Sequence, residues 1–190
     1  MPHIPLDERL PGIRGLAAYR TDTGRLLYEL AEALLRSEST LPPAERELIA
    51  AYVSSRNECF FCVSSHAAAS RHLYGDRRQL VDAVIDDLAK APIDDKLRAL
   101  LVIAGKVQRD GRLVSDADVA EARRHGATDR EIHDTVLIAA AFSMFNRYVD
   151  GLNTWAPTDP KAYAEMGKRM AEEGYAGRFA GLVAGPETAR

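Results

Sequence analysis

The chain has 190 residues, of which 46% are hydrophobic and 28% charged, and its formal net charge is −3. Length and composition are typical of a globular domain with a sizeable core. The slightly negative charge excludes a strongly basic surface for nucleic acid or for an anionic membrane. No apolar run approaches the roughly 20 residues of a membrane-spanning helix, and residues 1–8 lack the features of a signal peptide, so we expect a cytoplasmic protein.

Helical patterns dominate the chain, and strand patterns are nearly absent. Prolines and a glycine in residues 1–20 predict an extended lead-in. The glycine- and alanine-rich residues 174–190 predict a mobile tail. Between them, helical spacing of apolar residues and capping signals predict helices over about 23–37, 43–55, 57–75, 76–88, 92–109, 115–126, 128–148 and 160–173.

The predicted fold is therefore all-α, with seven or eight helices. We assign residues 1–155 to a single helical domain, and residues 156–190 to a C-terminal helix and the mobile tail. Two stretches, which begin at Pro42 and at Thr128, share a capped start, an acidic first turn and an apolar helix. This shared plan is compatible with an internal duplication.

The segment Cys59-Phe60-Phe61-Cys62-Val63-Ser64-Ser65-His66 contains the two cysteines of the chain at C-x-x-C spacing. If Asn57 caps this helix, Cys59 lies in its first turn, where unpaired backbone N–H groups favour the reactive thiolate. Positions 59, 62 and 66 share one helix face, so His66 can accept a proton from Cys62. In a cytoplasmic protein such a pair is more often catalytic or metal-binding than structural.

Glu47 precedes Cys59 by twelve residues and belongs to a different predicted helix. If the two helices pack antiparallel, Glu47 can orient or deprotonate His66, as in activated nucleophiles. Phe60 and Phe61 are expected to shield the pocket and to offer an apolar surface to a hydrophobic substrate. Two thiols and a nearby base are the minimum set of groups that thiol redox chemistry requires.

Two other interpretations of the motif stay open. The two thiols can simply fill a contact between helices, without any chemistry. Alternatively, Cys59, Cys62 and His66 can bind zinc, with His72 or Glu47 as the fourth ligand, although the sequence lacks a second Cys/His pair at metal spacing.

Other polar residues are weaker candidates for the site. Residues 146–152 can hold an Arg147–Asp150 ion pair or form a polar wall of the active site. Tyr52 and Ser55 are candidate neighbours of the pocket. Structural or solvated positions are expected for the remaining histidines: His3, His72, His125 and His133.

One set of residues resembles the active-site signature of the AhpD-like alkylhydroperoxidases, within the carboxymuconolactone decarboxylase superfamily: Glu47, Cys59, Cys62 and His66. The flanking segments 43–49 and 146–152 resemble its peroxidase-related branch, and the similarity spans about residues 10–155. The resemblance implies an all-helical fold with a duplicated helical unit. It also implies an obligate homo-oligomer, such as a dimer, trimer or hexamer.

The resemblance further implies a thiol-dependent peroxidase that needs no metal, haem or flavin cofactor. Cys62 would be the peroxidatic thiolate, and Cys59 the thiol that resolves its sulfenic acid. His66 and Glu47 would relay the proton of Cys62. An external dithiol, either a protein or a lipoyl-type group, would reduce the resulting disulfide. The pattern departs from AhpD at Phe61, where AhpD has a histidine.

Two functional alternatives remain beside the peroxidase. The chain can be a protein disulfide or thiol oxidoreductase, whose substrate is another protein. It can also be a non-catalytic redox sensor, in which the disulfide changes the oligomeric state.

Overall fold

The computed structural model describes residues 1–183, which form ten α-helices and two short 3₁₀ helices without any β-strand. The α-helices are α1 (Ile13–Tyr19), α2 (Thr21–Leu35), α3 (Pro43–Arg56), α4 (Phe60–Tyr74), α5 (Gln79–Asp86), α6 (Asp95–Arg109), α7 (Asp116–Arg124), α8 (Asp129–Gly151), α9 (Pro160–Glu173) and α10 (Ala176–Val183). The 3₁₀ helices η1 (Gly75–Arg77) and η2 (Gly111–Leu113) follow α4 and α6. The all-α prediction is confirmed, and the predicted count of seven or eight helices is wrong.

Two helices at the ends of the chain account for the difference. α1 lies within the lead-in that was predicted to be extended, and that prediction is wrong for residues 13–19 because Leu16 and Ala17 bury a helical face. α10 lies within the stretch that was predicted to be a mobile tail. The last part of that tail, residues 184–190, lies outside the described residues.

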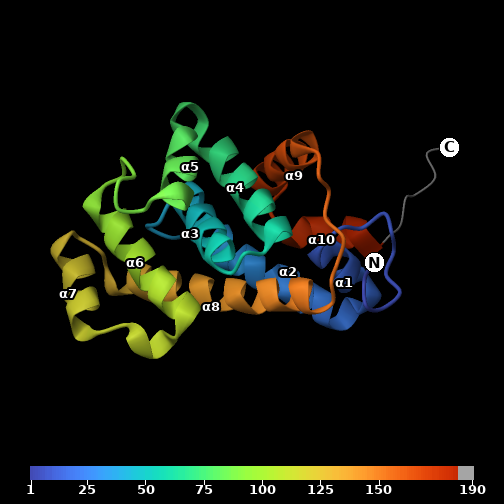
Figure 1. Ribbon diagram of the computed structural model, residues 1–190, viewed down its shortest axis with the longest axis horizontal. Coiled ribbons are helices and arrows are strands. Elements are labelled where there is room, and N and C mark those ends of the chain that lie inside the picture. Colours follow the sequence, from blue (N-terminus) through green and yellow to red (C-terminus); the bar gives the residue numbers. More distant parts are fainter. Residues whose placement is uncertain (184–190) are drawn as a thin grey trace.

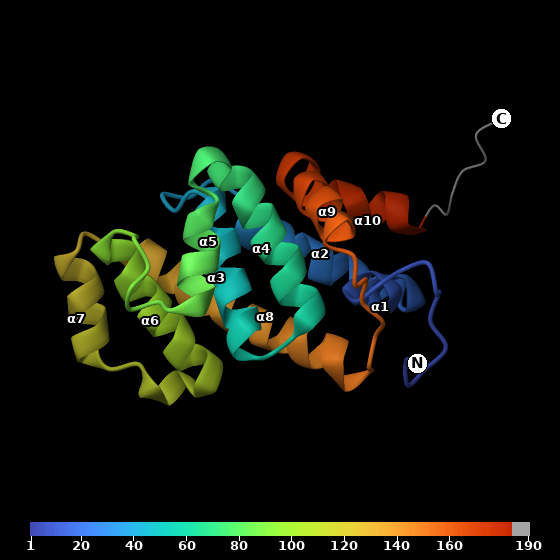
Figure 2. The ribbon, with the colours of Figure 1, turned by 45° about the horizontal axis from the view of Figure 1, so that its top comes forward.

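The centre of the fold is α3, in which ten of 14 residues are buried. It packs most extensively against α4, and it also contacts α6 and α8. The long helix α8 extends beneath this group, from the α6–α7 end of the molecule to the α1–α10 end (Figures 1 and 2). The two helices that carry the predicted site, α3 and α4, are therefore supported from several sides.

The C-terminal helices return to the part of the fold that holds the C-x-x-C motif. α9 packs on α4, and α10 packs on α2. The α4–α9 approach is close because Gly167 has no side chain: a Cβ there would lie 2.5 Å from the carbonyl carbon of Ala68. The segment after residue 156 thus covers one side of α4.

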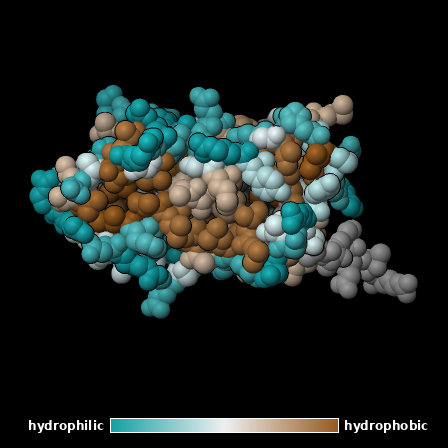
Figure 3. Space-filling model, turned by 90° about the horizontal axis from the view of Figure 1, so that it is seen from below, coloured by the Kyte–Doolittle hydropathy of each residue, from teal (hydrophilic) through white to brown (hydrophobic). Residues whose placement is uncertain are grey.

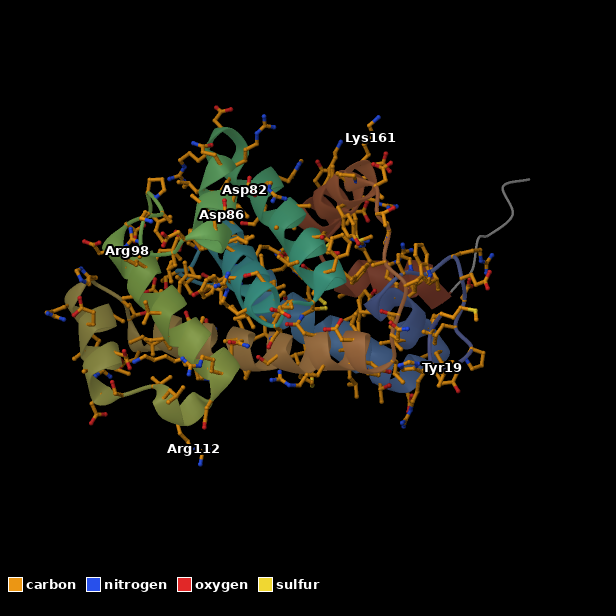
Figure 4. All side chains as sticks on the ribbon, viewed as in Figure 1. Tyr19, Asp82, Asp86, Arg98, Arg112 and Lys161 are labelled. Atoms are coloured by element: carbon orange, nitrogen blue, oxygen red, sulfur yellow. The ribbon has the colours of Figure 1, made fainter. Side chains whose placement is uncertain are left out.

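The surface carries both polar side chains and one broad apolar region (Figures 3 and 4). Arg112 and Lys161 point away from the helices (Figure 4). On the face along which α8 runs, a broad apolar surface occupies the middle of the molecule (Figure 3). α8 carries two exposed apolar side chains, Leu137 and Met144, which are 39% and 45% exposed. None of the helices within residues 1–183 has both the length and the apolar character needed to cross a bilayer.

Candidate active site

The turn between α3 and α4 determines where the first cysteine lies. Glu58 adopts a left-handed backbone conformation, with φ of 58°, which is uncommon for a residue with a side chain. The backbone N–H of Cys59 then donates to the carbonyl of Ser54 at 3.1 Å. Cys59 itself is the N-cap residue of α4, so the predicted N-cap at Asn57 is wrong.

Asn57 instead ties this turn to two neighbouring helices. Its side-chain nitrogen donates to Asn146 on α8 at 2.8 Å, and its oxygen accepts from Gln108 on α6 at 2.9 Å. Asn146 is buried and donates in turn to the hydroxyl of Ser54 at 3.0 Å. The amide of Asn146, part of the predicted polar wall, therefore anchors the turn that positions Cys59.

Both cysteines are free thiols, and both are buried. Cys62 lies in the first turn of α4, three residues after Cys59. Hydrogen bonding to Cys62, followed by burial, raises the pKa of the Cys59 thiol well above its usual range. Cys59 is therefore held as a protonated thiol beside Cys62.

Glu47 on α3 and His66 on α4 meet across the contact between these two helices. The Nδ1 atom of His66 lies 2.7 Å from Oε2 of Glu47, whose side chain is fully buried. A carboxylate can only accept hydrogen bonds, so Nδ1 of His66 carries the hydrogen of this bond. The other ring nitrogen, Nε2, is then left as the acceptor.

Two further side chains hold the second oxygen of Glu47. Arg36 and the hydroxyl of Tyr175 each donate to Oε1 at 2.6 Å. Burial opposes ionisation of Glu47, but His66, Arg36 and Tyr175 together outweigh it, so the pKa of Glu47 is lowered. Burial, and then the charge of Glu47, raise the pKa of Tyr175 well above its usual value. Glu47 is thus a charged carboxylate, and Tyr175 is a neutral phenol.

His66 and Cys62 line one pocket, although no hydrogen bond joins them in the described structure. The ring of Phe142 packs edge-on against His66, with ring centroids 4.5 Å apart. The pocket contains about 650 Å³ of empty space, including the part that opens to solvent. Its remaining lining is mostly apolar and comes from α1, α2, α4, α8, α9 and α10: Ile13, Leu27, Tyr28, Ala31, Phe61, Phe145, Met166 and Met170, with Arg14, Ser65, Tyr175 and Arg178.

The two phenylalanines of the motif have different surroundings. Phe60 is 55% exposed, whereas Phe61 is buried and lines the pocket. Phe61 packs against Gly12, where a Cβ would lie 2.3 Å from the ring and the φ of 56° also favours glycine. Tyr163 on α9 packs edge-on against both phenylalanine rings. Burial, and then the neighbouring Cys62, raise the pKa of Tyr163 to about 12.

Solved structures and a family model place the fold among known proteins. The model of the carboxymuconolactone decarboxylase family matches residues 21–89. An uncharacterised peroxidase-related protein from Silicibacter sp. TM1040 is 32% identical, over 81% of this chain and 78% of that chain, with a TM-score of 0.73. The chain belongs to the carboxymuconolactone decarboxylase superfamily, in its AhpD-like branch.

Two more distant structures have the same fold as this superfamily member. An uncharacterised peroxidase-related protein from Ralstonia eutropha JMP134, described as an alkylhydroperoxidase AhpD core, is 27% identical over 88% of this chain and 96% of that chain, with a TM-score of 0.76. A protein of unknown function from Agrobacterium tumefaciens is 24% identical over 76% of this chain and 97% of that chain, with a TM-score of 0.66. No curated protein matches the chain.

In this AhpD-like chain, sequence reasoning missed two residues that contact Glu47. Arg36 is the C-cap residue of α2, and Tyr175 lies in the stretch that was predicted to be a mobile tail. Tyr175 is buried and is 128 residues away from Glu47 along the chain. Neither residue belongs to a recognisable motif, so no local pattern in the sequence could have indicated these contacts.

Other predicted site neighbours of the AhpD-like chain have structural roles. Tyr52 and Ser55 do not line the pocket, and the Ser55 hydroxyl donates to the carbonyl of Tyr52 at 2.8 Å. Within the described residues Arg147 and Asp150 form no ion pair, because Arg147 donates to the carbonyl of Ser143 at 2.9 Å. Asp150 is instead a neighbour of Cys59 and contributes to raising its pKa.

The remaining histidines lie apart from the pocket, and three of them pair with acids. His72 lies 3.4 Å from Glu172, so it does not join the cysteines. His125 and His133 contact Glu121 at 2.8 Å and Asp134 at 2.9 Å. Residues 1–183 contain no group of three His, Cys, Asp or Glu side chains arranged to hold a metal ion, so the geometry gives the zinc interpretation no support.

Proposed function

We propose that this chain is a thiol-dependent peroxidase that reduces organic hydroperoxides through Cys62. One observation carries the proposal: the buried carboxylate of Glu47 orients His66 at 2.7 Å, and His66 faces the same pocket as Cys62. A carboxylate that orients a histidine next to a nucleophile is the usual arrangement for activating that nucleophile. The first helical turn, where Cys62 lies, also favours negative charge.

The first half of the reaction cycle oxidises Cys62. The Cys62 thiol passes its proton to Nε2 of His66, through a water or the peroxide in the pocket, and the imidazolium is stabilised by Glu47. The thiolate attacks the terminal peroxide oxygen, and the O–O bond breaks. The leaving alkoxide takes the proton back from His66, which gives an alcohol and a sulfenic acid on Cys62.

The second half of the cycle uses Cys59. Its thiol attacks the sulfenic sulfur of Cys62, an S–S bond forms, and the sulfenic oxygen leaves as water. An external dithiol then exchanges with the disulfide, restores both thiols and is itself oxidised. Because the pKa of Cys59 is raised, Cys59 does not compete with Cys62 for the peroxide.

The closed surroundings of the thiols favour a small peroxide over a protein disulfide as the oxidant. The exposed fractions of Cys59 and Cys62 are only 0% and 3%. A folded protein cannot bring its disulfide to a buried sulfur unless the site opens, whereas a small apolar peroxide can enter the pocket. The same argument favours a slender reductant, such as a lipoyl-type dithiol, over a bulky one.

The active form in this proposal is a homo-oligomer. The apolar surface on the α8 face, where Leu137 and Met144 are exposed, is the kind of surface that subunits bury against one another (Figure 3). Sizing of the reduced and oxidised protein measures the oligomer directly. Equal size in both redox states, together with turnover, would exclude the alternative of a redox-sensing oligomer.

A single-turnover assay tests the proposed chemistry. The reduced protein is mixed with cumene hydroperoxide, and peroxide loss and thiol loss are followed together. We expect one peroxide consumed per chain and two thiols lost. In the Cys59→Ser variant we expect the same first turnover but a sulfenic acid that reacts with dimedone. The proposal fails if Cys62→Ser consumes peroxide as fast as the wild type.

A further inference from the structure

The pocket of Cys62 contains two arginines that the proposed chemistry does not use. Arg14 on α1 and Arg178 on α10 both line it, together with the apolar side chains. The helices α1 and α10 contact each other, so both guanidinium groups belong to the same side of the pocket. Cys62 and His66 reach the pocket from α4.

Neither arginine forms an ion pair among the described residues, although Glu173 is near enough to influence the pKa of Arg178. The side chains of Arg14 and Arg178 form no ion pair and donate no hydrogen bond within residues 1–183. Nη1 of Arg178 is buried without a hydrogen-bond acceptor. A buried guanidinium donor without an acceptor is unfavourable, so the site gains stability from an anion that enters it.

Arg178 lies near other positive charges. Burial lowers the pKa of Arg178, and Arg169 and Arg14 lower it further, against the opposite influence of Tyr28 and Glu173. Tyr28 lines the same pocket and is near both arginines, since Arg14 and Arg178 each influence its pKa. An anion at this place relieves the repulsion between the arginines.

From this geometry we infer that the pocket takes hydroperoxides of carboxylic acids, with the carboxylate held by Arg14 and Arg178 and the peroxide directed to Cys62. A guanidinium matches the planar carboxylate and can donate two parallel hydrogen bonds to it. The apolar side chains that line the pocket between the two ends suit a hydrocarbon body. The inference rests on the proposed function for its reaction and deepens it by naming the substrate class.

The binding test needs no turnover. Octanoate and its neutral isostere octanamide are compared as protectants of Cys62 against iodoacetamide, with the labelled peptide measured by mass spectrometry. We expect octanoate to protect at a concentration about tenfold or more below that of octanamide, because charge-assisted hydrogen bonds are stronger than neutral ones. In the double variant R14Q/R178Q this preference falls to less than about twofold.

A matched control distinguishes specific binding of the carboxylate by Arg14 and Arg178 from a general attraction to nearby positive charge. Arg169 is exposed and does not line the pocket, although it is close enough to influence Arg178. The variant R169Q should keep the preference for octanoate. The inference is overturned if octanoate fails to protect, if octanamide protects equally well, or if R14Q/R178Q keeps the preference. Thermal unfolding of each variant verifies the fold.

The same variants distinguish this inference from the proposed function. With a carboxylated hydroperoxide and with cumene hydroperoxide, R14Q/R178Q should lower kcat/KM about tenfold for the first substrate only. If neither peroxide is consumed but octanoate still protects, the peroxidase proposal fails and the carboxylate site stands. If the wild type consumes both peroxides and R14Q/R178Q lowers kcat/KM equally for the two, the carboxylate site fails and the peroxidase proposal stands.

Discussion

Two buried glutamates, Glu47 on α3 and Glu131 on α8, have similar burial but different partners. Both are essentially inaccessible, and both are paired with a cation. Glu131 completes a capping box: it accepts the backbone N–H of Thr128 at 2.7 Å and the ammonium of Lys96 at 3.0 Å. Its partners fix the start of α8 and the position of α6, so all of its contacts are structural.

Glu47 differs from Glu131 in the kind of partner it has. Beside Arg36 and Tyr175, it binds His66, whose ring reaches a pocket that also contains a thiol. A buried carboxylate and its cation are therefore not enough to indicate a site. The informative feature is a titratable neighbour that connects the carboxylate to accessible space.

The largest expected effect comes from removing the charge of each glutamate in turn. We expect Glu47→Gln to lower kcat/KM for cumene hydroperoxide by about 100-fold, because the imidazolium of His66 loses its counter-charge. Glu131→Gln should leave kcat/KM within about threefold of wild type. Peroxide consumption at a saturating dithiol concentration measures both. Equal losses in the two variants would show that the comparison between the carboxylates is wrong.

The next largest effect concerns the loss of folding stability at acid pH. Glu47 and Glu131 should contribute to this loss in the same direction. The pKa of each is lowered in the fold, because their hydrogen-bonding and cationic partners outweigh burial. The unfolded chain therefore binds more protons between the folded and unfolded pKa values, and stability falls as pH drops below about 4.5. We expect this loss to be smaller in Glu47→Gln and in Glu131→Gln, measured by urea unfolding between about pH 3 and pH 7.

Glu45 provides a control of opposite sign for the acid titration. Burial, and then nearby Asp94, raise the pKa of Glu45. Its ionisation therefore opposes folding as pH rises through its folded pKa. Glu45→Gln should keep the acid-induced loss seen in wild type and should not lower stability near pH 7. A reduced acid slope in this variant would contradict the assignment of that slope to Glu47 and Glu131.

Removing the hydroxyl of Tyr175 should have a smaller effect on stability, and it tests the hydrogen bond from Tyr175 to Glu47. Tyr175→Phe removes a hydrogen bond to Oε1 of Glu47 and should lower the free energy of unfolding by about 1 kcal/mol. Tyr74→Phe is the matched control, since the buried hydroxyl of Tyr74 has no partner among the described residues. Chemical unfolding should show a larger loss of unfolding free energy for Tyr175→Phe than for Tyr74→Phe. A similar loss in both variants would show that the Tyr175 hydroxyl does not stabilise the fold through Glu47.

The smallest effect concerns the turns that lead into α4 and α8. Each turn contains one left-handed residue, Glu58 with φ of 58° and Gly126 with φ of 87°. Glu58→Gly should stabilise the protein by a few tenths of a kcal/mol, because relief of strain slightly exceeds the added entropy of the unfolded chain. Gly126→Ala should cost about 0.5 kcal/mol, because the strain of a Cβ at this φ exceeds the entropy that the unfolded chain loses, and no atom lies within 4 Å of the added Cβ. Both changes should leave peroxide consumption unaltered.

The sequence allowed the local features of this structure to be predicted better than its long-range contacts. The capping box at Thr128 and the apolar run after it correctly predicted the start of α8. The spacing of Cys59, Cys62 and His66 correctly indicated one helix, but not that Cys59 caps it. These features depend on neighbouring residues, whose hydrogen bonds and helical spacing follow from the local sequence.

The contacts that complete the site were beyond such local rules. Tyr175 lies in a stretch rich in glycine and alanine, and only the packing of α9 on α4 and of α10 on α2 brings it to Glu47. The position of Arg14 and Arg178 in one pocket likewise depends on the contact between α1 and α10. Single side chains that meet across the whole length of a chain leave no periodic pattern in the sequence.

The most direct test of the central claim, that Glu47 and His66 activate Cys62, is the rate of Cys62 alkylation at pH 7. Iodoacetamide labelling is followed by peptide mass spectrometry in wild type, Glu47→Gln and His66→Ala. We predict that Cys62 reacts before Cys59 in wild type, and that both substitutions slow its labelling about tenfold or more because less thiolate is present. Unchanged labelling rates in both variants, or faster labelling of Cys59, would contradict the account.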